Sequence, residues 1–258
     1  MTPLELFGII CALIVLRIAM SVRPVSVAGG GEIQTSGDAL VPSAPRSGSP
    51  LSAVVKEYLD AFIVAGLVAL FLITFVVRTF YIPSGSMEPT LEINDVLLVN
   101  EFQYRFWPPH DGDVVVFQPP IPTPNDFIKR MIAGPGQTLR IQNGIVYRDG
   151  VALDEPYIAQ KPAYALTIKN YDIYVGGQPL DPTQANIPPR SDWTAPDRIP
   201  KGCYFMMGDN RNDSEDSHIW GFAQEHGTFW SGPLRGQKAS FTGRAFLIFW
   251  PPGRIHTL

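Results

Sequence analysis

The sequence predicts a mostly β protein. We expect an antiparallel sheet core with an inserted β subdomain, preceded by one or two N-terminal transmembrane helices. Three observations support this fold class. The 258 residues include 25 prolines and 23 glycines, which favour turns and short strands over long soluble helices. Two apolar stretches lie near the N-terminus, and from Asp95 onward hydrophobic residues recur with a period of two.

Composition argues against two classes of function. The formal net charge of −4 gives no basic face for nucleic acid, so we expect no nucleic-acid partner. Cys11 and Cys203 lie far apart in the sequence and do not make a disulfide framework. The four histidines are scattered and no cysteine–histidine cluster has zinc spacing, so we expect no metal and no cofactor.

The stronger apolar stretch predicts a membrane span. Residues 61–77 are uncharged and lie between Asp60 and Arg78. At about 1.5 Å per residue they cover about 26 Å as a helix, and adding residues 80–82 approaches the thickness of a hydrocarbon core. A buried soluble helix is the alternative, but few are this long without a polar face. We therefore assign residues 58–82 to a transmembrane helix.

The first apolar stretch is weaker. Glu5 and Arg17 interrupt it, although both are close enough to its ends to reach the membrane surface. A cleaved signal peptide ending at the small residues 26–28 is the alternative, but no basic residue precedes Arg17. We therefore favour residues 1–22 as a first transmembrane helix.

The loop between these stretches sets the predicted orientation. Residues 23–57 are rich in Gly, Ser and Pro and carry Arg23, Arg46 and Lys56, whereas the N-terminal tail has no basic side chain. The positive-inside rule places such a loop in the cytoplasm. Everything after Arg78 is then extracytoplasmic.

Short runs bounded by Gly, Pro and Asp predict the strands of the soluble part. The candidates are residues 96–99, 114–117, 128–132, 138–141, 145–147, 203–207 and 245–250. Asn143-Gly144 between two apolar runs is a hairpin signal. We expect residues 83–150 and 201–258 to form the two parts of a β core, and the polar, proline-dotted residues 151–200 to be the insertion.

The segment YIPSGSMEPTL, residues 81–91, follows the predicted span directly. It could be only a turn that leads out of the membrane. However, Ser86 is flanked by Gly85 and Met87, which suggests an accessible serine on a constrained turn. Eight residues from Arg78 reach at most about 26 Å when extended, so Ser86 is predicted to act near the bilayer surface.

The segment DFIKRMIAGPG, residues 126–136, places a lysine in a predicted strand. Alternation puts Lys129 on the same face as Phe127 and Met131. Burial there would lower the lysine pKa from about 10.4 toward 8, because desolvation disfavours the ammonium. A neutral lysine can take the proton of a serine hydroxyl. A snorkelling lysine at a sheet edge is the alternative.

A third segment, residues 206–221, combines an apolar run with many short polar side chains. It is typical of a loop held by its own hydrogen bonds. Asp209, Asp213 and Asp216 could supply oxygens to calcium, but their spacing does not fit an EF-hand.

These segments together resemble the bacterial type I signal peptidases, or leader peptidases, which are serine proteases with a Ser–Lys dyad. SGSMEPTL, DVLLVN, GDVVVF, FIKRMIAGPGQ, NGIVY and GDNRNDSEDSHIWG follow a predicted span in this order, and GRAFLIFWP fits the last strand. The resemblance covers about residues 60–150 and 200–221. Each motif is weak alone, and the ordered set is specific.

The resemblance implies roles for individual residues. Ser86 would be the nucleophile and Lys129 its general base, while the Ser86 N–H and the Ser84 hydroxyl would form the oxyanion hole. Ser214 would orient the lysine. The implied structural supports are Arg130, Asp209 and Asp216, with Asp209 paired to Arg130. His218 stands where related enzymes often have arginine, which puts an Asp–Arg support pair in doubt.

The resemblance also implies the substrate and the location. A membrane-bound endopeptidase would remove signal peptides from exported preproteins after Ala-x-Ala, with the peptide added as a strand between residues 82–84 and 126–128. The implied substrate-binding residues are Ile82, Pro83, Met87, Leu91, Phe127 and Ile128. A monomer in the bacterial inner (plasma) membrane, with its catalytic domain on the periplasmic side and the lipid bilayer as its second partner, is expected.

Three other functions are weighed against this one. A self-cleaving repressor-type protein shares the Ser–Lys chemistry but would need a DNA-binding domain. A dedicated conjugation-type Ser–Lys peptidase with one substrate remains open. An inactive membrane-tethered β scaffold that binds peptides would not need both the serine and the lysine in their motifs.

Overall fold

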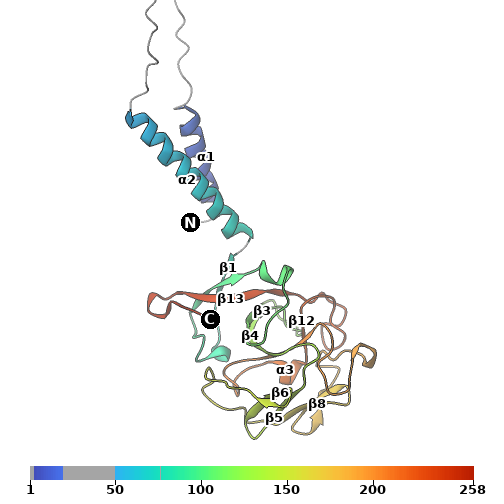
Figure 1. Cartoon of the computed structure of the whole chain (residues 1–258). Coiled ribbons are helices and arrows are strands. Elements are labelled where there is room, and N and C mark those ends of the chain that lie inside the picture. Colours follow the sequence, from blue (N-terminus) through green and yellow to red (C-terminus); the bar gives the residue numbers. More distant parts are fainter. Residues whose placement is uncertain (1–2, 20–49, 76) are drawn as a thin grey trace, which may run out of the picture. The chain divides into compact units, whose positions relative to one another are not determined.

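The computed structural model describes residues 3–19, 50–75 and 77–258. The chain divides into two compact units, residues 1–75 and 76–258, and each is described by itself. The second unit is mostly β and holds two antiparallel sheets, which confirms this part of the predicted fold class (Figure 1).

The first unit contains helix α1 (Pro3–Ala19) and helix α2 (Pro50–Phe75). Arg17 Nε lies 2.6 Å from Asp60 Oδ1, so an ion pair joins the two helices. Ile10 is buried against α2. A Cβ at Gly66 would lie 2.9 Å from the Ile10 side chain, so this close approach requires glycine.

Among the helices that the structure describes, none is both long enough and apolar enough to cross a membrane.

The helix boundaries differ from those predicted. The loop predicted over residues 23–57 ends earlier, because α2 already begins at Pro50, and residues 20–49 lie outside the described chain. The helix predicted over residues 58–82 ends at Phe75, and strand β1 (Val77–Tyr81) follows. All five residues of β1 pair with a neighbouring strand. Apolar content alone did not separate the end of the helix from this strand.

The larger sheet has the strand order β1-β2-β13-β3-β4-β11-β12, and β14 pairs with β13. Its further strands are β2 (Val96–Asn100), β3 (Val114–Phe117), β4 (Phe127–Ala133), β11 (Cys203–Met207), β12 (Ala223–Gln224), β13 (Phe241–Trp250) and β14 (His256–Thr257). The last long strand, β13, lies between β2 and β3 and pairs with both, so it joins the two parts of the β core. A Cβ at Gly243 would overlap the Asn100 carbonyl, so the crossing with β2 requires glycine there.

The second sheet has the order β10-β9-β8-β5-β6-β7. Its strands are β5 (Leu139–Gln142), β6 (Ile145–Arg148), β7 (Val151–Ala152), β8 (Leu166–Lys169), β9 (Asp172–Val175) and β10 (Gln178–Pro179). Asn143 and Gly144 have φ of 54° and 72°, which confirms the predicted hairpin. The insertion predicted at residue 151 starts at Leu139 in this sheet, because β5 pairs with β6 and β8.

Strand β3 carries the core of the larger sheet, because all four of its residues are buried. Val114 and Val116 belong to one cluster with Met87, while Val115 and Phe117 belong to another with Met131. A third cluster joins Ile141 and other residues of the second sheet to Cys203, Phe205 and Met207 of β11. The sheet that carries the candidate site is therefore packed on both faces.

Hydrogen bonds of Asn186 join the insertion to residues 222–231, which lie in the connection between β11 and β13. Its Nδ2 donates to the Phe222 carbonyl and to Gln224 Oε1, both at 2.9 Å, and its Oδ1 accepts from the backbone N–H groups of Trp230 and Ser231. The side chain is fully buried. From these four hydrogen bonds we expect the Asn186 side chain to contribute strongly to the stability of the folded protein.

Replacing Asn186 by alanine should lower the free energy of unfolding by about 2–4 kcal/mol, because several buried backbone groups lose their partner. Gln142→Ala, at an exposed position of β5, should change it by less than about 0.5 kcal/mol. Urea unfolding of both variants measures the difference. Equal values for the two variants would contradict this account of Asn186.

Candidate active site

Ser86 lies on the single turn η1 (Gly85–Met87) that follows β1. The chain before it is fixed by hydrogen bonds between Ile82 and residues 94–95. The chain after it is fixed by Met87, which is fully buried in the core and whose carbonyl accepts from Leu91 N–H. Ser86 therefore lies on a turn that is held in place on both sides.

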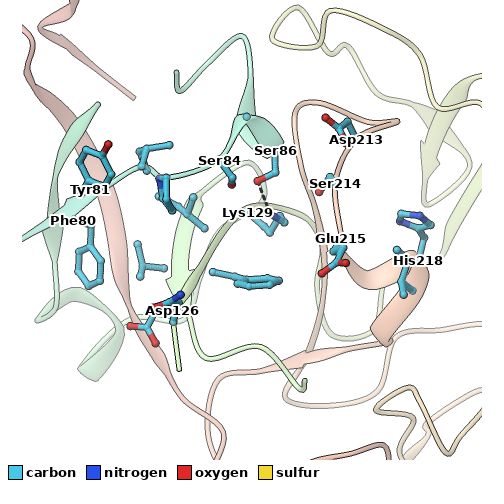
Figure 2. A pocket seen from close by; sticks show the side chains of 18 of the residues that line it. Phe80, Tyr81, Ser84, Ser86, Asp126, Lys129, Asp213, Ser214, Glu215 and His218 are labelled. Atoms are coloured by element: carbon cyan, nitrogen blue, oxygen red, sulfur yellow. Dashed lines mark hydrogen bonds between the residues drawn. The ribbon is translucent and has the colours of Figure 1, made fainter. Parts of the chain in front are cut away.

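Lys129 lies in the middle of β4 with only 4% of its surface exposed. Its Nζ is 2.7 Å from Ser86 Oγ, although the two residues are 43 positions apart in the sequence (Figure 2). The same Nζ lies 5.1 Å from the centre of the Phe127 ring, on the face that strand alternation predicted. The sheet thus brings the two predicted catalytic residues into hydrogen-bonding contact.

Burial lowers the pKa of Lys129 to about 8. Removal from water disfavours the ammonium, and this effect exceeds the opposing attraction of Asp216, Glu215 and Asp209. About a tenth of the amine is therefore uncharged at pH 7, and about half at pH 8. An uncharged amine at 2.7 Å can accept the serine proton, which is what a weak hydroxyl nucleophile requires.

A cleft of about 610 Å³ opens beside this pair. Its lining contains Ile82, Pro83, Ser84, Phe127, Ile128 and Ser214 from the predicted site. Met87 and Leu91 were also predicted to bind substrate, but both are fully buried in the core and do not line the cleft. The turn at Ser86 directs these two side chains into the core, which the one-dimensional pattern did not reveal.

The loop after β11 supports β4 through Arg130. Arg130 donates to Asp209 through Nε at 2.8 Å and through its terminal nitrogen at 2.6 Å. Asp209 also accepts from the Thr90 hydroxyl at 2.5 Å, and it has no exposed surface. One carboxylate thereby joins the strand of Lys129 to the segment that follows Ser86.

Asp216 caps the short helix α3 (Ser217–Trp220) and is also fully buried. It accepts from the Gly208 N–H at 3.0 Å, and its other oxygen lies 2.5 Å from His218 Nδ1. The position where an Asp–Arg pair was in doubt therefore holds an Asp–His pair. Ser214, predicted to orient the lysine, lies in the cleft, but its buried hydroxyl has no hydrogen-bond partner among the described residues.

The segment between β7 and β8 is a second support for β4 and for the loop after β11, and the sequence did not reveal it. Glu155 lies 2.7 Å from the fully buried Arg211. The Tyr157 ring lies 4.0 Å beneath the Arg130 guanidinium, and Asn212 accepts from Ala163 N–H at 2.8 Å. These contacts join residues that are far apart in the sequence, and no local pattern predicts such pairs.

Metal ligation has no candidate among the residues described, since no three His, Cys, Asp or Glu side chains are grouped to hold an ion.

The comparisons with known proteins agree on one family. Residues 55–250 match the family described as signal peptidase, peptidase S26. A probable signal peptidase I-1 of Synechocystis sp. is 42% identical over 202 residues, which cover 73% of this chain and 89% of that protein. The signal peptidase I of Leptolyngbya laminosa is 34% identical, with 84% and 88% covered, and that of Pseudomonas aeruginosa is 35% identical, with 65% and 63% covered.

The acylation rate of Ser86 by a serine-directed reagent should fall about tenfold per pH unit below pH 8, because protonation of Lys129 removes the base. Above that pH the rate should level off. Mass spectrometry of the modified Ser86 measures the rate. A midpoint between pH 6 and 7, which is typical of a Ser–His pair, would contradict the role of Lys129.

Proposed function

Because this chain belongs to the peptidase S26 family of signal peptidases, we propose that Ser86 and Lys129 are the nucleophile and general base with which it removes signal peptides. The enzyme is a serine endopeptidase of the signal peptidase I type. The observation that supports the residue assignment most strongly is the 2.7 Å contact between the buried Lys129 amine and the Ser86 hydroxyl.

The geometry supports a two-step mechanism. Ser86 Oγ attacks the scissile carbonyl carbon while Lys129 Nζ takes the hydroxyl proton. The resulting ammonium then gives this proton to the leaving amine as the C–N bond breaks. The neutral amine next activates a water molecule, which attacks the acyl ester and frees Ser86. Each step moves one proton through the same nitrogen.

The oxyanion that forms in each step needs donors beside Ser86. We assign this role to the Ser86 backbone N–H and to the Ser84 hydroxyl, whose residue lines the cleft in an extended conformation. Such donors typically contribute a few kcal/mol to transition-state binding. Ser214 lies in the same cleft, and its buried hydroxyl has no partner in the part of the chain that the structure describes, so we propose that it bonds to Lys129 or to the substrate.

Substrate recognition would use the same cleft. Residues 82–84 and residues 126–128 both line it, and we propose that an extended peptide adds as a strand between them. Ile82, Phe127 and Ile128 make the wall apolar near Ser86. We propose that this wall accepts small side chains, which gives cleavage after Ala-x-Ala.

The proposed location follows from the family and the charge pattern. The S26 signal peptidases are membrane-anchored. We propose the bacterial plasma membrane, with residues 76–258 on the periplasmic side, because three of the four basic side chains before Arg78 lie in residues 23–57. The substrate would then arrive with its apolar segment in the same bilayer.

Ser86→Ala and Lys129→Ala should each lower cleavage of a preprotein with an Ala-x-Ala site by at least about a thousandfold, because each removes one half of the acylation step. The assay uses purified full-length protein in detergent without added metal, and follows the shortened product on a gel. Thermal unfolding checks that the variants remain folded.

Two matched controls keep this test specific. Ser191→Ala and Lys169→Ala change exposed residues that do not line the cleft, and both should cleave at the rate of the unchanged protein. Cleavage that survives in Ser86→Ala would refute the assignment of the nucleophile. Full activity of Lys129→Ala would refute the assignment of Lys129 as the general base.

A further inference from the structure

His218 occupies an unusual place at the border of the catalytic cleft. Its ring stacks on Tyr164 with 4.3 Å between ring centres and 16° between ring planes. Its Nδ1 lies 2.5 Å from Asp216, and its side chain is only 18% exposed. The ring is thus fixed from two sides, by the segment before β8 and by the cap of α3. In Figure 2, His218 lies at one end of the cleft that holds Lys129.

Asp216 connects His218 to the catalytic lysine. It is fully buried, and the N–H groups of Gly208 and His218 hold it in place at 3.0 and 3.2 Å. While burial lowers the pKa of Lys129, Asp216 is the largest of the opposing influences. Any change in the net charge of the Asp216–His218 pair therefore changes the pKa of the Lys129 amine.

We propose that His218 is a positioning residue that couples its own protonation to the charge state of Lys129 through Asp216. When the ring takes up a proton, the pair becomes neutral overall and Lys129 loses its strongest attraction to a proton. When the ring is neutral, the pair carries one negative charge and favours the ammonium. This inference rests on the proposed roles of Ser86 and Lys129.

The other charged groups around His218 do not provide this coupling to Lys129. Arg211 faces the cluster but is paired with Glu155 at 2.7 Å, and Arg130 is paired with Asp209 at 2.6 Å. Burial raises the pKa of Tyr164 far above its ordinary value, so its hydroxyl stays neutral. The Glu215 carboxylate also favours the ammonium.

The consequence is a pH response that a fixed cation would not give. Burial already lowers the pKa of Lys129 to about 8. A proton on the ring and a proton on the lysine disfavour each other, so protonation of the ring keeps more of the lysine uncharged. The enzyme should therefore retain activity at lower pH than Lys129 beside Asp216 alone would allow.

Two substitutions separate the charge of His218 from its hydrogen bond. In His218→Asn the amide nitrogen can replace Nδ1 as the donor to Asp216 but cannot become charged. In His218→Arg the charge is permanent. The experiment measures the rate of Ser86 acylation and kcat/KM for preprotein cleavage between pH 5 and 10 in the full-length protein.

In His218→Asn the acid limb of both profiles should fall more steeply and reach rates about tenfold below those of the unchanged protein at the acid end, which is the size of effect that a nearby unit charge produces. At high pH the two rates should be equal. In His218→Arg the midpoint should lie at or below that of the unchanged protein. His226→Asn is the matched control, because that exposed histidine also lies beside a carboxylate but does not line the cleft.

A His218→Asn profile with the same shape as that of the unchanged protein, and with the rate scaled equally at every pH, would show a merely structural role and overturn the proposal. If His218→Asn does not fold, as judged by its Tm, His218→Gln replaces it and the same outcomes apply. Failure of the proposed function would look different: the unchanged protein would not cleave preprotein at any pH. The acylation profile needs no peptide, so it tests His218 independently.

Discussion

The contact between the Lys129 amine and the Ser86 hydroxyl depends on keeping that amine out of water. A charged ammonium at this position would leave the serine without a base, so burial must outweigh three nearby carboxylates. The architecture serves this requirement. Lys129 lies on a strand whose neighbour β3 is buried along its whole length, and the Phe127 ring shields the amine within the strand itself.

The loop after β11 places acidic residues near Lys129, where their negative charges favour the ammonium. Its two buried carboxylates have hydrogen-bonding partners of their own, which limit this effect. Asp209 is held by Arg130 and Thr90, and Asp216 is held by Gly208 and His218. The segment of the insertion around Tyr157 covers these partners, so the second sheet contributes to the site although it supplies neither catalytic residue.

Much of this could be predicted from the sequence where the signal is local. Strands at residues 114–117 and 203–207 have the predicted bounds, and period-two alternation placed Lys129 beside Phe127. Features that depend on tertiary contacts were missed. The strand after Phe75 looked like a continuation of an apolar helix, Met87 looked like a cleft residue although it points into the core, and Glu155 gave no sign of its pairing with Arg211.

The most direct test of this account is the titration of the Lys129 side chain itself, followed by the NMR signal of its nitrogen in protein labelled with ¹⁵N-lysine. The signal can be assigned by its loss in Lys129→Met. The structure predicts a pKa of about 8 for this amine. A pKa near 10.5, the ordinary value for lysine, would show that burial does not favour the neutral amine and would contradict its role as the base.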